Sequence, residues 1–252
     1  MAALPSNLVI IGTGRVAEAL IRFLSSREGL NICVIGRNSA RLKEIQLKYS
    51  VEISENLNDS AVEWAIVAIS DDALKDVISN VKAKWISITA GTADWRLYGE
   101  NCSILYPLQS FSANADIQLE NIPFIIDGDT SSIANLEKWT DLLSLKAQQF
   151  GLEKREKLHV VAVFLNNFVH HIMAKGIDLA KNYEINPEIF EALISETFNR
   201  FDMENPYSQQ TGPAERKDEV TIEKHRKYLS DGDLSLYNIL SISIKATKDA
   251  EL

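Results

Sequence analysis

The sequence has few cysteines and no excess of basic residues. Cys33 and Cys102 are the only two cysteines in 252 residues, and this usage fits neither the clustered ligands of a metal site nor a disulfide-stabilised fold. We therefore expect two buried free thiols and no metal. The formal net charge is −9 at pH 7, which argues against nucleic acid as a partner, because phosphate binding depends on a basic surface.

The first residues also lack the features of a signal sequence or a membrane span. No basic residue precedes the apolar run of residues 8–11, and that run is too short to be either. The chain contains no internal repeat and no low-complexity tract. Its 46% hydrophobic and 24% charged residues are ordinary for a soluble globular protein, so we expect a cytoplasmic protein with no membrane partner.

What the sequence does contain is a glycine turn between an apolar run and a helical pattern. Residues 8–11 lead into Gly12 and Gly14, and small Ala17 follows in the expected helix. This order is typical of a dinucleotide site: one glycine permits the tight turn, the next lets a pyrophosphate approach the backbone, and the helix N-terminus offers free N–H groups. The cofactor contacts predicted in this turn are Gly12, Thr13, Gly14, Arg15 and Val16.

The end of the second expected strand, residues 31–35, indicates which dinucleotide is bound. Sites that prefer NAD carry an acidic residue near this point, which binds the adenosine ribose, but residues 30–42 contain no Asp or Glu. Arg37, Asn38 and Ser39 stand there instead, and the planar fork of an arginine suits the oxygens of a 2′-phosphate. We therefore predict NADP rather than NAD. The alternative is that Ser39 only caps the next helix and that Arg37 is solvated.

Apolar runs alternate with helical patterns over the first part of the chain. The run at residues 64–69 is apolar without interruption, which suits a parallel strand covered on both faces. The pattern predicts an α/β fold, a doubly wound Rossmann sheet, which we assign to residues 1–152 as an NAD(P)-binding domain. The further strands are expected at residues 51–53, 85–88, 103–106 and 123–126.

Ser70 and Asp71 follow the expected strand at residues 64–69. Because ligands bind beyond the carboxyl ends of the strands in such a sheet, we expect both residues near the ribose or the nicotinamide of the cofactor. The alternative role for either residue is to cap the helix that follows.

Residues 153–252 have an all-helical character, and we assign them to a C-terminal α domain. The first half of the helix expected at residues 157–182 is apolar all round, which predicts a central, buried helix. The other helices are expected at residues 187–200, 219–229 and 234–250.

A polar stripe interrupts this apolar helix. His159, Val163, Asn166 and His170 fall on one face by the helical period. Buried polar groups are costly unless they are paired, so the stripe must face a cleft, a ligand or a polar partner. We take His159 and Asn166 as candidate catalytic residues; the alternative for His159 is a hydrogen-bonded core histidine.

A second polar stretch precedes the helix at residues 219–229. Thr211 and Arg216 in this stretch could line a cleft and hold an anionic substrate, and Arg216 is our candidate clamp for a carboxylate. The alternative is structural: Asp218 caps the helix and Arg216 pairs with an acid.

Four segments of the sequence together resemble a family of bacterial Rossmann-like NADP oxidoreductases with a helical C-terminal domain of unknown function. The resemblance covers nearly the whole chain, and it implies a C-terminal domain similar to that of 6-phosphogluconate dehydrogenase. More remotely, the chain is similar to ketopantoate reductase and pyrroline-5-carboxylate reductase. In such relatives the helical domain completes the cleft and mediates dimerisation, so the resemblance implies a homodimer. The segments are residues 12–17, 106–111, 159–166 and 211–218.

Two positions depart from the patterns of these relatives. Family members often have His-Pro where this chain has Tyr106-Pro107. The related β-hydroxyacid dehydrogenases have a catalytic lysine one helical turn before the asparagine, where this chain has Ala162. The proton donor that those enzymes use is therefore missing here.

These features together predict an NADP-dependent oxidoreductase that moves a hydride between nicotinamide and a small carbonyl or imine substrate. Negative charge builds on the substrate heteroatom during reduction, so a proton source and a donor must stand beside it. His159 is the candidate acid/base, Asn166 the orienting donor and Arg216 the clamp. The rival hypothesis is a non-catalytic NADP-binding regulatory or sensor protein; Ala162 favours it and the polar stripe disfavours it.

Overall fold

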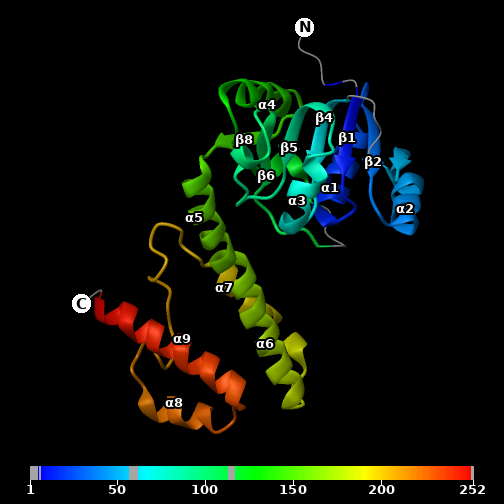
Figure 1. The fold of residues 1–252 in the computed structure, drawn as a ribbon. Helices are drawn as coiled ribbons and strands as arrows, with labels where there is room; N and C mark the ends of the chain where they lie inside the picture. The colour runs from blue at the N-terminus through cyan, green and yellow to red at the C-terminus, as the bar shows by residue number, and fades with distance from the viewer. Residues whose placement is uncertain (1–4, 6, 57–61, 113–116, 251–252) are drawn as a thin grey trace. The chain divides into compact units, whose positions relative to one another are not determined.

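The first part of the chain folds into an eight-stranded sheet (Figure 1). The computed structural model describes residues 5, 7–56, 62–112 and 117–250. The strands lie in the order β3-β2-β1-β4-β5-β6-β7-β8, and neighbours are parallel except β6 and β7. Their bounds are β1 Asn7–Ile11, β2 Asn31–Ile35, β3 Glu52–Ser54, β4 Val62–Val67, β5 Ala83–Ile88, β6 Cys102–Pro107, β7 Pro123–Asp127 and β8 Lys146–Gln149.

Helices cover both faces of this sheet, and β1 shows why. Alternate side chains of a strand point to opposite faces, so the uninterrupted apolar run of β1 needs cover on both sides. Leu8 and Ile10 pack in one apolar cluster with α1, α2 and α4, whereas Val9 and Ile11 pack in a second cluster with α3. The helix bounds are α1 Arg15–Ser25, α2 Ser39–Tyr49, α3 Leu74–Ile78 and α4 Thr130–Leu142.

The order in which strands are added to the sheet changes direction at β1. The chain builds β1, β2 and β3 outward in one direction and then returns to place β4 on the other side of β1. The backbone N–H of Gly12 donates to the carbonyl of Ile35, and that of Ala68 donates to the carbonyl of Ile11, both at 2.8 Å. The carboxyl ends of β1, β2 and β4 therefore stay joined, and in this class of sheet ligands bind in the crevice outside that point.

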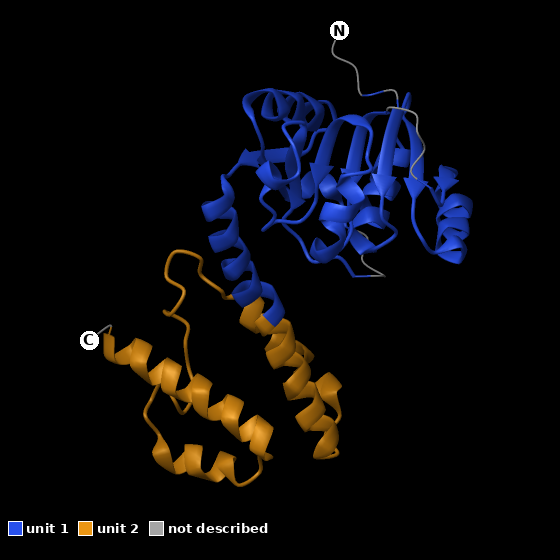
Figure 2. Cartoon of the chain, in the orientation of Figure 1, with its two compact units in different colours: residues 1–167 blue, residues 168–252 orange. Residues whose placement is uncertain are grey.

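The chain forms two compact units, unit 1 with residues 1–167 and unit 2 with residues 168–252 (Figure 2). Our predicted boundary after residue 152 falls at the start of α5, whereas unit 1 includes α5 and continues to residue 167. Unit 2 is helical. The remaining bounds are α5 Leu152–Ala162, the π-helical segment Val163–Phe168, α6 Val169–Asn182, α7 Glu191–Asn199, α8 Glu219–Arg226 and α9 Asp231–Ala250.

The structure confirms the predicted Rossmann sheet followed by a helical region. It also contains β8, which the sequence pattern did not predict. β8 is short and polar, Lys-Ala-Gln-Gln, and its residues are mostly exposed. β8 forms through backbone hydrogen bonds to β7. These bonds do not require apolar side chains, so no sequence pattern predicted the strand.

The prediction of a central, buried helix is wrong for the single chain. Val160, Val161, Phe164 and Leu165 are each more than half exposed, with values of 57%, 51%, 63% and 61%. In the described part of unit 2, the buried residues are Ala180, Ala214, Ile222 and Ser241. Leu152–Asn182 is long and apolar enough to cross a membrane, by length and composition alone. A helix that is buried against another protein subunit has the same apolar composition.

Candidate functional site

A cavity of about 1190 Å³ opens at the carboxyl ends of β1, β2 and β4. Small-molecule sites commonly measure about 300–1,000 Å³, so this cavity has room for a dinucleotide. Most of the cofactor contacts predicted from the sequence line it: Gly12, Thr13, Gly14, Arg15, Val16, Arg37, Asn38 and Ser70. Ser39 and Asp71 were predicted with them but are not among its lining residues.

Gly12 sits where no side chain fits. Its φ is +130°, and a Cβ atom built there would lie 2.1 Å from the carbonyl oxygen of Ala68. Gly36, at the end of β2, is similarly restricted, because its Cβ would lie 2.6 Å from Cγ2 of Thr13. The turn after β1 therefore packs directly on the ends of β4 and β2, and only glycine permits this approach.

Gly14 has a different role from Gly12. Its φ is −76°, which any residue can adopt, and it occupies the N-cap position of α1 without a side-chain cap. A Cβ built on Gly14 would meet no atom within 4 Å. The first turn of the 11-residue helix α1 thus leaves its N–H groups uncapped at the cavity. Uncapped N–H groups and the helix dipole favour phosphate at this point, so the residues present fit a pyrophosphate.

Arg37 and Asn38, which follow β2, line one side of the cavity. The side-chain oxygen of Asn38 accepts a hydrogen bond from the backbone N–H of Arg41 at 3.0 Å, so Asn38 caps α2. The alternative in which Ser39 caps α2 is therefore wrong, because Ser39 is already the first residue of the helix. Arg37 is exposed at the cavity.

A partly buried carboxylate near the glycine turn, Glu18, pairs with the neighbouring cations. Glu18, in the first turn of α1, accepts from Lys48 Nζ at 3.1 Å and from the Tyr49 hydroxyl at 3.0 Å, and also pairs with Arg41. Burial opposes ionisation of Glu18, but the hydrogen bonds from Lys48 and Tyr49 and the charge of Arg41 outweigh it and lower its pKa. Arg41 and Lys48 are thus paired with Glu18 and do not line the cavity, whereas Arg15 and Arg37 do.

Several lining residues were not predicted from the sequence. Thr89, Gln109 and Phe111 follow β5 and β6, and Glu55 and Asn56 follow β3. The carboxyl ends of parallel strands meet at one edge of a sheet, and this rule could have found all five. Two more lining residues, Asp76 and Val77, come from α3, and no feature of the sequence marked them.

The structure does not place the three candidate catalytic residues in this cavity. His159 lies on α5 and Asn166 in the π-helical segment, and both side chains are exposed. Neither they nor Arg216, which lies in unit 2, belongs to the cavity lining. Asp218 caps α8 as the structural alternative required, because its carboxylate accepts from the backbone N–H of Thr221 at 3.0 Å. The Thr221 hydrogen bonds lower the pKa of Asp218, and the Arg216 charge contributes.

The comparison with known proteins agrees with this geometry. Residues 7–91 match the family model described as NADP oxidoreductase, coenzyme F420-dependent. Residues 122–244 match a domain of unknown function, DUF2520. A crystal structure named "putative NADP oxidoreductase" from Bacteroides fragilis is 30% identical, with a TM-score of 0.86 over 95% of this chain and 98% of the other. This chain belongs to that NADP oxidoreductase family.

More distant structures share the fold of this NADP oxidoreductase family member. A protein from Thermotoga maritima is 21% identical, with a TM-score of 0.69 over 97% of this chain and 99% of the other. The 1-pyrroline-5-carboxylate reductase of Streptococcus pyogenes is 16% identical, with a TM-score of 0.61 over 95% of this chain and 98% of the other. No curated protein sequence matches significantly. Family membership supports an oxidoreductase that uses a nicotinamide nucleotide.

Proposed function

We propose that this family member is an NADP-dependent oxidoreductase that acts on a small carbonyl or imine compound. The observation that carries the proposal is the cavity beside Gly12 and Gly14, where the uncapped start of α1 faces the space that a pyrophosphate needs. In this proposal Gly12 keeps the turn close to β4, and Gly14 leaves the backbone open to the phosphates.

The order of the strands gives the orientation of the cofactor in this proposal. The adenosine half belongs over β2 and β3, where Gly36, Arg37 and Asn38 line the cavity, because these strands lie on one side of β1. The nicotinamide half belongs over β4, β5 and β6, where Ser70, Thr89 and Gln109 supply hydroxyl and amide groups. This arrangement follows the general rule for doubly wound sheets.

The preference for NADP rests on Arg37. Its side chain is exposed at the adenosine side and is not drawn to Glu18, which is already paired with Arg41 and Lys48. Arginine binds phosphate oxygens in a bidentate manner. Glu55, from the end of β3, also lines the cavity and would oppose a 2′-phosphate placed beside it. The preference therefore depends on Arg37 lying closer to the 2′ position than Glu55.

Reduction of the substrate needs a proton as well as a hydride. When bound, the nicotinamide supplies the hydride to the electrophilic carbon of the carbonyl or imine. The hydroxyl of Ser70 and the amide of Gln109 can stabilise charge on the substrate heteroatom, but these groups do not titrate near neutral pH. The hydroxyl of Thr89 already donates to the carbonyl of Val67 at 3.3 Å. We assign the proton donor to His159, with Asn166 as orienting donor and Arg216 as the carboxylate clamp, because histidine is the side chain that most often acts as a general acid or base in enzymes.

The rival function is a sensor that binds NADP without chemistry. Ala162 favours this rival, because it replaces the lysine of the related dehydrogenases, and so does the position of His159 outside the cavity lining. Oxidation of NADPH with a panel of small carbonyl and imine compounds separates the two. Turnover that His159→Gln abolishes without changing NADPH affinity supports the enzyme. Turnover unchanged in His159→Gln removes His159 from the mechanism, and NADPH binding without turnover for any compound supports the sensor.

We also propose that the protein is a homodimer and that a second copy covers the apolar helix. Phe164 and Leu165 are exposed. The described part of unit 2, residues 168–252, buries only three apolar side chains. A unit of this size needs a larger core than Ala180, Ala214 and Ile222 provide. The polar residues His159 and Asn166 on the same helix disfavour a lipid environment, where unpaired polar groups are costly.

A further inference from the structure

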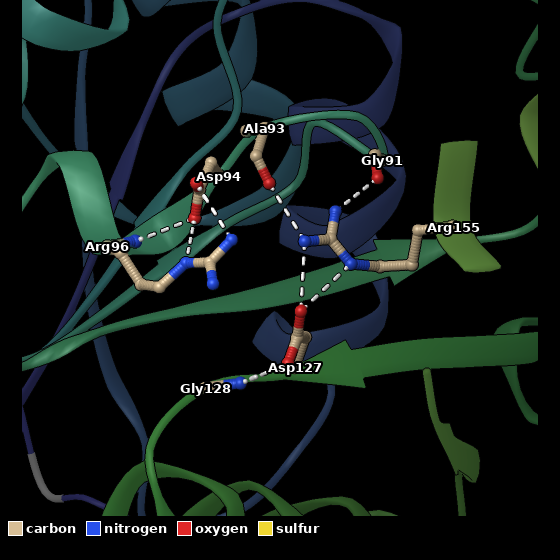
Figure 3. Close-up of polar contacts among 7 residues, drawn as sticks. All are labelled: Gly91, Ala93, Asp94, Arg96, Asp127, Gly128 and Arg155. Atoms are coloured by element: carbon tan, nitrogen blue, oxygen red, sulfur yellow. Dashed lines mark hydrogen bonds and ion pairs between the residues drawn. The ribbon is translucent and has the colours of Figure 1, made fainter. Parts of the chain in front are cut away.

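A fully buried arginine holds the loop that follows β5 (Figure 3). Arg155 of α5 has 0% exposure, and its Nε and Nη2 donate to Asp127 Oδ2 at 3.2 and 3.0 Å. Nη2 also donates to the carbonyl of Ala93 at 2.9 Å, and Nη1 donates to the carbonyl of Gly91. One guanidinium thus joins the end of β7 to two carbonyls of the loop formed by residues 89–94.

The chemistry of this contact requires an arginine. A buried charge is costly unless it is paired and hydrogen-bonded, and the planar fork of arginine reaches a carboxylate and two carbonyls together. Asp127 is itself held, because its Oδ1 accepts from the backbone N–H of Gly128 at 2.9 Å. The pair of Asp94 and Arg96 on the same loop differs, since it is more exposed and joins residues only two apart.

The opposite side of the loop rests on an aromatic ring. A Cβ built on Gly91 would lie 2.8 Å from ring atoms of Tyr106, so the Gly91 backbone lies against that ring. Burial raises the pKa of Tyr106, which keeps the phenol uncharged. The loop is therefore held by Arg155 through its carbonyls and by Tyr106 through close packing.

The first residue of this loop, Thr89, lines the cavity. Its backbone N–H donates to the carbonyl of Val67 at 3.1 Å, which places it over the ends of β4 and β5. We propose that Arg155 is a positioning residue: it fixes residues 89–94 so that Thr89 contacts the nicotinamide half of the cofactor. This inference rests on the proposed function, because it uses the orientation of the cofactor given there.

The test compares an intact cofactor with a fragment that lacks nicotinamide. Affinities for NADPH and for 2′,5′-ADP are measured by titration calorimetry for the wild type and for Arg155→Lys. Lysine keeps the positive charge opposite Asp127 but lacks the planar guanidinium that also reaches the two carbonyls. We expect the NADPH affinity to fall about tenfold, which corresponds to the loss of roughly one hydrogen bond. The affinity for 2′,5′-ADP should stay within about twofold. Lys157→Met, an exposed position on the same helix, is the matched control and should change neither value.

Each outcome bears on the proposal. Equal losses for both ligands in Arg155→Lys indicate general destabilisation and overturn the positioning role, as does an unchanged NADPH affinity. If the wild type binds neither ligand, the proposed function fails; if it binds both and Arg155→Lys keeps their ratio, only the positioning role fails.

A second measurement needs no variant. Amide hydrogen exchange of Thr89 and Ala93, whose N–H groups donate to the carbonyls of Val67 and Ala90, should be slow in the wild type without NADPH, because Arg155 already holds the loop. Fast exchange that becomes slow only when NADPH is added would overturn the inference even if Arg155→Lys did not fold.

Discussion

Gly12 and Ala68 approach each other so closely that the space between them excludes a methyl group. A Cβ on Gly12 would lie 2.1 Å from the Ala68 carbonyl oxygen. This contact joins the turn after β1 to the end of β4, at the point where the winding of the sheet reverses. Gly14, two residues further on, faces open space. The two glycines of one motif therefore differ: the first lets the turn pack on β4, and the second leaves the backbone open at the cavity.

Substitution of each glycine by alanine should separate these purposes. Gly12→Ala forces the turn away from β4 and adds strain at a positive φ, so we expect a loss of several kcal/mol of unfolding free energy. Gly14→Ala should unfold like the wild type in urea but lose at least about tenfold in NADPH affinity, because its methyl group occupies the phosphate space. If Gly14→Ala binds NADPH normally, the pyrophosphate does not lie on the Gly14 backbone.

Removal of the Arg37 charge should weaken binding of NADPH but not of NADH. Hydrogen bonds to a charged group contribute about 1.5–3 kcal/mol, so we expect Arg37→Ala to lower the NADPH affinity at least about tenfold and to leave that for NADH within about twofold. Lys43→Ala, an exposed position on α2 outside the cavity lining, is the control. Equal losses of NADPH and NADH affinity would place Arg37 near the shared part of the cofactor.

The Glu18 contacts should stabilise the fold at neutral pH and be lost in acid. The pKa of Glu18 lies below its ordinary value of 4.5 in the folded chain. The unfolded state therefore binds the proton first, and the stabilisation is complete above the ordinary value and is lost as the pH falls through the lower, folded value. We expect Glu18→Gln to lower the unfolding free energy by about 1 kcal/mol at pH 7 and to lose less stability on acidification.

Urea unfolding at a series of pH values between about 7 and 3 checks this prediction. Glu44→Gln is a suitable control, because Glu44 is exposed and shares only the partner Arg41 with Glu18 among their salt bridges. A wild type and a Glu18→Gln variant with parallel pH profiles would contradict the role given to Glu18.

The exposed face of the long helix should be covered by a second copy of the chain. Phe164→Glu places a charge in the proposed interface, so we expect a monomer or an aggregated protein where the wild type has twice the mass of one chain in light scattering. Leu47→Glu is the control, since Leu47 of α2 is 85% exposed in unit 1. A monomeric wild type, or one extracted from membranes only by detergent, would contradict the homodimer.

The sheet and many of the cavity-lining residues could be predicted because their signals lie close together in the sequence. The strand ends, the glycines and Arg37 are marked by residue types at fixed spacing along the chain. Thr89, Gln109 and Phe111 follow other strands of the sheet, so the strand-end rule could place them at the same edge. Their position beside Gly12 depends on the order of the strands, which the sequence of a single strand does not show.

The long helix shows a second limit. Its apolar surface predicted a buried helix, but the residue types do not say whether the same chain or another copy covers it, because the hydrophobic effect is non-directional. The side chain of Arg155 illustrates a third limit. A charged residue in a helix between Lys154 and Glu156 reads as solvated, and only the fold reveals that it is the buried partner of Asp127.

The most direct test of the proposed cofactor site is a titration of the wild-type protein with NADPH, followed through nicotinamide fluorescence. The proposal predicts saturable binding of one NADPH per chain, displaced by 2′,5′-ADP and weakened in Gly14→Ala. The absence of binding at about millimolar NADPH, equivalent to less than roughly 4 kcal/mol of affinity, would contradict it.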